Sequence, residues 1–234
     1  MTLAMYEEPV FALPHPPISL SVFLVVEEAI CAAWQVLRLR PPSGFVLGTA
    51  VEVQITAVLH QVLKDEIWNR DVVEGFDDEV IRTIIRPEVV SFDRKSLSKR
   101  PDMMVELVDR PVGVRPSQDG MFVECKPVDA AHPLPACYCD EGIHRFICGD
   151  YAWAMTEAMM VGYADSDEKA LDELGPALEA RKDKVLPLDV PCACSHSAEE
   201  QAVAVTIHHR SFPYLETGQQ APDITLRHLW LCRN

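Results

Sequence analysis

The spacing of apolar positions changes along the chain and separates helical from extended stretches. A helical period predicts one helix from a Ser19 or Ser21 cap to about Arg40, where Pro41-Pro42 stops it. A second helix is expected over residues 49–69. Runs that are rich in Ile and Val, or that alternate apolar with polar residues, predict strands at 79–92 (two if Pro87 divides it), 102–109, 120–126, 201–210 and 224–232.

Three further stretches complete the expected organisation. Residues 144–163 are apolar nearly all round and indicate a buried helix, whereas the acidic residues 165–184, broken at Gly175-Pro176, indicate one or two solvated helical pieces. The Pro-rich residues 1–17 are expected to form an arm on the domain or on a partner subunit. This order predicts the α/β or α+β class around one mixed sheet, in a single domain 1–234 with an arm and helix (1–45), a core (46–210) and a C-terminal strand (211–234).

Charge and apolar content refine this picture. The formal net charge is −15, which is unusual for a protein that binds nucleic acid, yet residues 79–126 hold nine basic and eight acidic residues and are close to neutral. The longest apolar run, 18–34, is interrupted by Glu27 and Glu28, so neither a membrane span nor a signal peptide is expected. We therefore expect a cytoplasmic protein with reduced cysteines. Basic residues available to line a groove are Arg82, Arg86, Arg94, Lys95, Lys99, Arg100, Arg110 and Arg115.

Two acidic residues are spaced for direct pairing across a hairpin. Asp102 and Glu124 are equidistant from Gly113, so an antiparallel turn near Gly113 would place them side by side. Glu124 and Lys126 are two apart on one strand and point to the same face. Apolar residues flank both acids, so we expect the two strands to enter the core. A charge that is buried there needs a metal ion or a charged partner.

The segments Arg100-Pro101-Asp102 and Glu124-Cys125-Lys126 resemble the motif of the PD-(D/E)xK (restriction-endonuclease-like) nuclease superfamily, whose core is αβββαβ. The resemblance covers residues 48–210. It implies that Asp102 and Glu124 bind Mg²⁺ or Mn²⁺ and that Lys126 activates or positions the attacking water. The alternative is that Pro101-Asp102 is a loop dipeptide, that Glu124 and Lys126 are an exposed pair on a strand, and that Lys126 only forms a salt bridge to Asp102 or Glu124.

Glu52 is the expected fourth member of the site, because the resemblance places a metal-binding acid on the first core helix and Glu52 shares the apolar face of Ile55 and Leu59. Thr49-x-x-Glu52 is equally a capping box, which would explain this glutamate without any chemistry. Glu66 is the substitute acid.

The resemblance also implies auxiliary residues on the helix that follows the Glu124 strand. His144, Arg145 and Tyr151 are the candidates, with His144 and Tyr151 on one helical face and Arg145 holding a phosphate at the helix N-terminus. Lys99 and Arg100 are further candidates for substrate binding. The alternative is that Arg145 is a solvated end and that Tyr151 fills the core.

Two cysteine pairs form a second candidate site. Cys137, Cys139, Cys192 and Cys194, with His196, could close a tetrahedral zinc site between two loops, although one residue between paired cysteines is an uncommon zinc spacing. The alternative is free cysteines in loops.

These residues predict a metal-dependent nuclease that cuts phosphodiesters by attack of water, with DNA favoured over RNA by the resemblance alone. A homodimer or a partner protein is a further expectation. Two rival functions remain open: a non-catalytic binding or assembly protein that keeps the nuclease fold, and a zinc-stabilised interaction module.

Overall fold

The computed structural model describes residues 12–111, 113–194 and 203–233. One seven-stranded sheet in the order β1-β2-β3-β4-β7-β6-β5 runs through the molecule. β3, β4 and β7 are parallel to one another, and the remaining neighbours are antiparallel. The chain is therefore of the mixed α/β class. The strands are β1 (Ile81–Ile85), β2 (Met103–Leu107), β3 (Met121–Val128), β4 (Glu157–Ala164), β5 (Cys192–Cys194), β6 (Val203–His208) and β7 (Ile224–Cys232).

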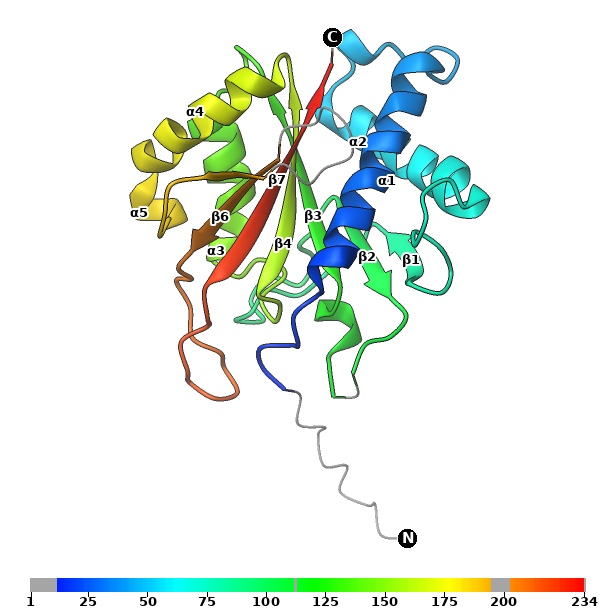
Figure 1. Cartoon of the computed structure of the whole chain (residues 1–234). Coiled ribbons are helices and arrows are strands. Elements are labelled where there is room, and N and C mark those ends of the chain that lie inside the picture. Colours follow the sequence, from blue (N-terminus) through cyan, green and yellow to red (C-terminus); the bar gives the residue numbers. More distant parts are fainter. Residues whose placement is uncertain (1–11, 112, 195–202, 234) are drawn as a thin grey trace, which may run out of the picture.

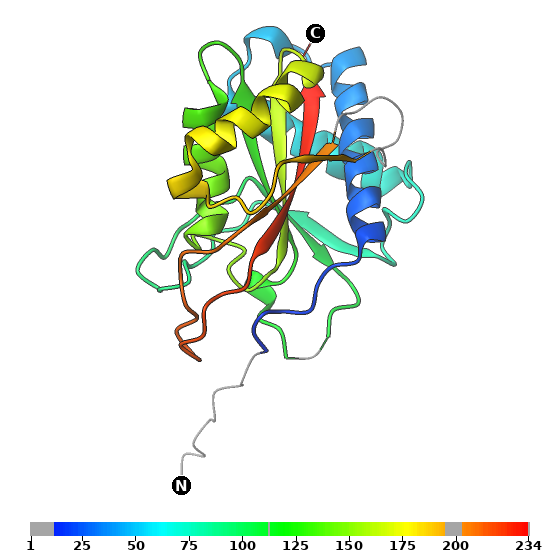
Figure 2. The same cartoon turned by 60° about the vertical axis from the view of Figure 1, so that its left-hand side comes forward.

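Helices cover both faces of this sheet (Figures 1 and 2). α1 (Leu20–Leu39) and α2 (Glu52–Val62) lie on one face, and the remaining α-helices lie on the other. Those on the second face are α3 (His144–Ile147), α4 (Asp167–Ala180) and α5 (Lys182–Val185). Shorter helical segments are η1 (Leu47–Thr49), η2 (Leu63–Ile67), η3 (Trp68–Arg70), η4 (Pro116–Gln118) and the ten-residue η5 (Leu134–Ile143).

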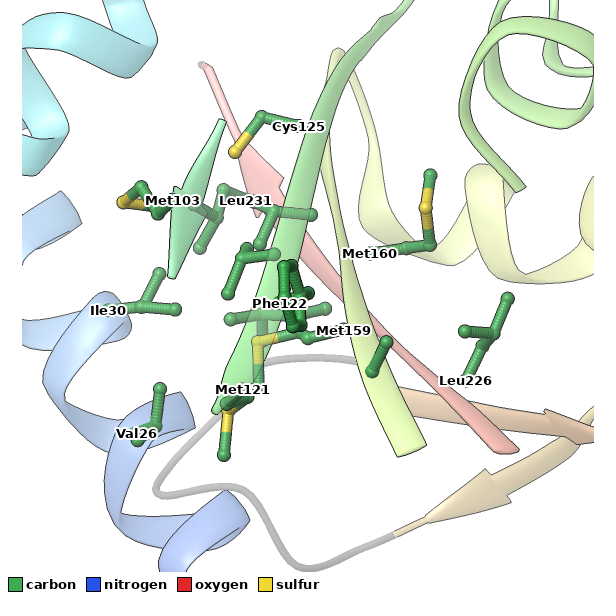
Figure 3. Packing of buried hydrophobic residues seen from close by; sticks show 14 of the residues in the cluster. Val26, Ile30, Met103, Met121, Phe122, Cys125, Met159, Met160, Leu226 and Leu231 are labelled. Atoms are coloured by element: carbon green, nitrogen blue, oxygen red, sulfur yellow. The ribbon is translucent and has the colours of Figure 1, made fainter. Parts of the chain in front are cut away.

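Apolar side chains from both faces of the central strands form one continuous core. Figure 3 shows Val26 and Ile30 of α1 facing Met103 and Met121 of the sheet, while Met160 and Leu226 project from the opposite face. Trp34 of α1 stacks on Tyr163 of β4, and its indole N–H donates to the Cys232 carbonyl at 2.9 Å. These contacts fix α1 across the centre of the sheet.

α1 is long and apolar enough to cross a membrane by length and composition alone, and half of its most apolar window is buried inside the molecule. Its interruption at Glu27 has a packing explanation. Glu27 is fully buried and accepts two hydrogen bonds from Arg227 of β7, at 2.5 and 3.0 Å. Glu28, by contrast, is exposed. The helix therefore packs as a core element with an internal ion pair.

Several sequence-based predictions agree with these elements. The first helix ends where expected, and the strands over 102–109, 120–126, 201–210 and 224–232 are present. Residues 12–17 of the predicted arm lie on the domain, where Arg110 donates to the carbonyls of Pro16 and Pro17. Residues 1–11 lie outside the described part.

The buried helix predicted over 144–163 is wrong. Within this range only the four-residue α3 is helical, as a continuation of η5, which ends at Ile143. Residues 157–164 form β4. β4 is parallel to both of its neighbours and is covered on both faces, so after Glu157 its residues are all buried and lack the alternation of a half-exposed strand. Gly162 permits this packing, because a Cβ atom there would lie 2.2 Å from the Trp230 ring.

Two other predictions need correction, and the position of the C-terminal strand is a new finding. α4 continues through Gly175-Pro176 and buries Leu174 and Leu178, so this acidic stretch is not broken there and is not fully solvated. Residues 86–92 contribute only an isolated bridge at Val89, and the predicted strand shortens to β1. β7 is the central neighbour of β4 and β6, so the C-terminal strand belongs to the interior of the sheet.

Candidate functional site: an acid–lysine cluster at the β2–β3 junction

Asp102 and Glu124 meet through the predicted hairpin register. β2 and β3 pair with Met103 opposite Val123 and Val105 opposite Met121, which is the register that symmetry about Gly113 requires. Asp102 directly precedes β2 and its Oδ2 accepts a hydrogen bond from the Cys125 N–H at 2.8 Å. The pairing therefore brings Asp102 beside the Glu124-Cys125-Lys126 segment.

Lys126 joins the acids into one cluster. Its Nζ lies 2.9 Å from Glu124 Oε1 and 2.9 Å from Glu52 Oε1, and it also donates to the Cys125 carbonyl at 3.1 Å. Glu124 and Lys126 are only 2% and 5% exposed, so this ion pair is buried in the protein. Their alternation with Val123 and Cys125 on β3 places both on one face, as the sequence predicts.

Glu52 reaches the cluster from α2, one of the two helices on the α1 side of the sheet. It is the first residue of α2, and its carboxylate accepts from Lys126 and does not cap the helix. The capping interaction is made by Gln54, whose Oε1 accepts from the Val51 N–H at 3.2 Å. The capping-box explanation for Thr49 and Glu52 is therefore wrong. Glu66, the substitute acid, is paired on the surface with Arg40 and Arg70.

Burial sets the protonation chemistry of the cluster. It raises the pKa of Glu124 to about 7, against the opposing effect of Lys126, and it raises the pKa of Asp102 above its ordinary value. Burial alone would lower the pKa of Lys126, but Glu124, Glu52 and Asp102 together raise it. The lysine therefore stays an ammonium, whereas Glu124 exchanges a proton near neutral pH.

Arg145 and Tyr151 also approach Glu124, but not from a common helix. Arg145 Nε lies 3.5 Å from Glu124 Oε1 and donates to the Glu141 carbonyl at 2.5 Å. Because η5 runs directly into α3, Arg145 is not at a helix N-terminus, and that part of the prediction is wrong. Tyr151 lies in the loop after α3, so the shared helical face with His144 is also wrong.

Tyr151 presents a buried hydroxyl to this carboxylate. Its ring stacks on Phe122 and meets Phe146 edge-on, and the pKa of its phenol is raised well above the ordinary value by burial and by Glu124. Within the described residues, neither its hydroxyl nor Glu124 Oε2 satisfies hydrogen-bond geometry with any group. Two buried polar atoms are thus available to a water molecule or a ligand.

The remaining candidate residues make other contacts. His144 Nδ1 contacts the Lys184 carbonyl, Lys99 Nζ lies 2.8 Å from Asp150, and Arg100 pairs with Glu88 on the surface. Arg86, which follows β1, does act on the cluster, because its charge opposes the rise that burial causes in the pKa of Asp102. Antiparallel pairing of β1 with β2 brings Arg86 there, a relation that the sequence alone does not reveal.

Most basic residues of the near-neutral segment are already paired with acids. Arg94 and Arg115 share Glu216, Lys95 contacts Asp93, and Arg110 forms a bidentate pair with Asp119. Arg82 donates to the Val108 carbonyl. A phosphate backbone would have to compete with these carboxylates, so the predicted basic groove is largely neutralised.

The cysteine pairs lie on different elements from those expected. Cys137 and Cys139 are in η5, and Cys192 and Cys194 form the edge strand β5, so neither pair is in a loop. Burial raises the pKa of Cys139 to about 12, which disfavours a zinc-binding thiolate. Among residues 12–111, 113–194 and 203–233, no three His, Cys, Asp or Glu side chains form a ready metal-binding group. His196 lies outside these residues, and the zinc site stays a prediction.

Comparison of the chain with protein-family models, with curated proteins and with solved structures gives no match. The function is therefore inferred from the geometry of the acid–lysine cluster.

Proposed function

We propose that the protein is a metal-dependent phosphodiesterase with a restriction-endonuclease-like core, and that its substrate is DNA. The observation that supports this proposal is the convergence of Asp102, Glu124 and Glu52 from two strands and a helix around one buried ammonium, Lys126. Three acids and a lysine exceed what a structural ion pair requires.

The chemistry of the donor set suits Mg²⁺ or Mn²⁺, although Glu52 and Glu124 are joined here by Lys126 and the three acids would have to close around the ion to bind it. These hard cations take carboxylate oxygens, and Glu124 Oε2 is a buried carboxylate oxygen that no described residue engages. Asp102, Glu124 and Glu52 would hold the ion, which, when bound, would polarise the scissile phosphate and lower the pKa of a bound water.

Lys126 supplies the second requirement for hydrolysis. Its ammonium can orient the attacking water and stabilise the negative charge that develops on the phosphate oxygens. Attack forms a bond from the water oxygen to phosphorus, breaks the bond to the leaving oxygen, and releases one proton. Burial strengthens the effect of Lys126, because a preorganised charge in a dry site needs no reorganisation.

The test is cleavage of supercoiled plasmid and linear DNA with Mg²⁺ or Mn²⁺. We expect Asp102→Asn and Lys126→Met each to lower the rate by about 100-fold or more, the scale for removing one charge-stabilising group. Asp109→Asn, an exposed acid just beyond β2, is the control and should cleave at the wild-type rate. Cleavage that survives both site variants would refute the assignment.

A non-catalytic binding or assembly protein is the second candidate. The ion-paired basic residues and the net charge of −15 favour it, because a polyanion gains little from such a surface. Calorimetry with Mn²⁺ separates the two candidates. Absence of both binding heat and cleavage in the wild type would support the second candidate.

A further inference from the structure

Arg210 is a buried arginine just beyond β6 whose guanidinium bonds to main-chain carbonyl oxygens. It is 4% exposed, and burial lowers its pKa to about 10. Nη1 donates to the Trp153 carbonyl at 2.7 Å, and Nη2 donates to the carbonyls of Ala152 (3.3 Å) and Met155. Burying a cation is costly, and the three carbonyls compensate for it together with the charges of Glu157 and Asp223, which oppose the lowering of the pKa.

These carbonyls belong to one tight turn. Ala152 has a φ of +51°, a left-handed conformation that a residue with a Cβ atom rarely adopts, and its carbonyl also accepts from the Met155 N–H at 3.1 Å. Such backbone persists only where its surroundings hold it. Here the guanidinium binds the carbonyls on both sides of the turn.

Tyr151 immediately precedes this turn. Its ring stacks on Phe122 and meets Phe146 edge-on, and its hydroxyl is near enough to Glu124 for the two groups to shift each other's pKa, without a hydrogen bond between them. The backbone direction at Ala152 therefore determines where the Tyr151 side chain leaves the loop. A change at Ala152 would move the hydroxyl relative to Glu124.

The earlier part of the same loop is held by a different segment. The Phe92 N–H donates to the Gly149 carbonyl at 2.9 Å, and Lys99 pairs with Asp150. Gly149 has a φ of +74°, and a Cβ atom there would lie 2.8 Å from both Phe212 and Phe92. The segment before Asp102 thus fixes one end of the loop, and Arg210 fixes the other.

We propose that Arg210 is a positioning residue of the acid–lysine cluster: by binding the 152–155 turn, it holds the Tyr151 hydroxyl against Glu124. This inference rests on the proposed function only where turnover is concerned. The structural relation between Arg210 and Tyr151 can be tested without any cleavage.

The first test is NMR of protein that carries ¹³C-labelled tyrosine. The chain has five tyrosines, and Tyr151→Phe assigns the Tyr151 signal. In Arg210→Met, and more weakly in Arg210→Lys, we expect the Tyr151 signal to shift or broaden while buried Tyr138 and Tyr163 stay unchanged. Tyr151 signals that match the wild type in both folded variants would overturn the inference, whether or not the protein cleaves DNA.

The second test is a double-variant cycle on turnover. Arg210→Met should lower kcat by about tenfold and leave KM nearly unchanged, and it should have no further effect in a Tyr151→Phe background. Val203→Ala, a core substitution in β6, which precedes Arg210, is the control for general destabilisation and should keep the wild-type kcat. Additive effects of Arg210→Met and Tyr151→Phe would contradict the proposal. An inactive wild type would refute the proposed function but leave the NMR result decisive.

Discussion

Glu124 and Lys126 show how burial acts differently on two neighbouring charges. Burial raises the pKa of Glu124 to about 7, whereas three acids keep Lys126 protonated. The ammonium is therefore a fixed charge, and the carboxylate is the group whose charge varies around neutral pH. Any ligand that requires an ionised Glu124 competes with one proton.

Binding of Mg²⁺ should consequently weaken as pH falls through 7. A raised pKa keeps Glu124 protonated below about pH 7, so the apparent affinity should drop by up to about tenfold per pH unit below that value. Calorimetry at pH 6, 7 and 8 measures this slope. Asp109→Asn should preserve the slope, and an affinity that is constant across this range would contradict the prediction.

Glu52 and Gln54 separate site chemistry from helix capping. Glu52→Gln removes a charge beside Lys126 and should lower cleavage by about tenfold with little change in melting temperature. Gln54→Ala removes the bond to the Val51 N–H and should cost about 0.5–1 kcal/mol of stability without affecting cleavage. Equal effects of both variants on cleavage would argue against a role for Glu52.

At this scale the sequence predicted the centre of the cluster but not its surroundings. Asp102, Glu124 and Lys126 could be placed because a hairpin register and a two-residue strand period determine their positions. Arg86 lies near the cluster because β1 pairs with β2, and Tyr151 does so because of a loop in which Ala152 is left-handed. Neither arrangement produces a periodic pattern in the sequence. Tyr151 was chosen as a candidate, but for a helical face that does not exist.

Among the elements, β4 and α1 were ambiguous for the same reason. Each is apolar on nearly every side, so the pattern of the sequence cannot separate a central strand from a buried helix. α1 was predicted correctly because Ser19 and Pro41-Pro42 bound a run long enough for a helix. In 144–163, Gly149 ends α3 before Tyr151, and a single glycine inside an apolar run is a weak stop signal.

The buried ion pair of α1 gives a prediction for this element. Glu27→Ala would leave the Arg227 guanidinium without its carboxylate in the core and should cost about 3–5 kcal/mol of unfolding free energy. Urea unfolding measures the change. Glu28→Ala, one position along on the exposed side, is the matched control and should change stability by less than about 0.5 kcal/mol.

Across the whole molecule, a buried hydrogen-bonded chain links α5, β6, β7 and η5. The Val185 carbonyl accepts only, so His208 Nδ1 carries the proton and its Nε2 accepts from Thr206. The Thr206 oxygen then accepts from His228 Nε2, and His228 Nδ1 accepts from Tyr138. Every group is satisfied only if both histidines are neutral. Burial accordingly lowers the pKa of His208 to about 4 and that of His228 well below its ordinary value.

This chain predicts acid sensitivity of the fold. Both histidines have depressed pKa values, so between pH 6.5 and 4 the unfolded protein binds protons that the folded protein does not. As the pH is lowered, the free energy of unfolding should therefore decrease by up to about 1.4 kcal/mol per pH unit for each histidine. Urea unfolding from pH 7 to 5 measures this slope. His209→Gln, an exposed neighbour, should leave it unchanged, whereas His208→Gln should reduce it. Glu124, whose pKa is raised, contributes a slope of opposite sign, so the decisive comparison is between variants: equal slopes in wild type and His208→Gln would contradict the neutral assignment.

The position of β7 has a consequence for how the protein is made. Residues 224–232 emerge after every strand that they pair with, yet they separate β4 from β6 and carry the Arg227 partner of α1. Until they emerge, β4 has an unpaired edge and Glu27 lacks its counter-charge. The nascent chain is therefore expected to remain incompletely folded, and its acid–lysine cluster poorly supported, until β7 has emerged. Under the proposed function, the protein would stay inactive until β7 has paired with β4 and β6.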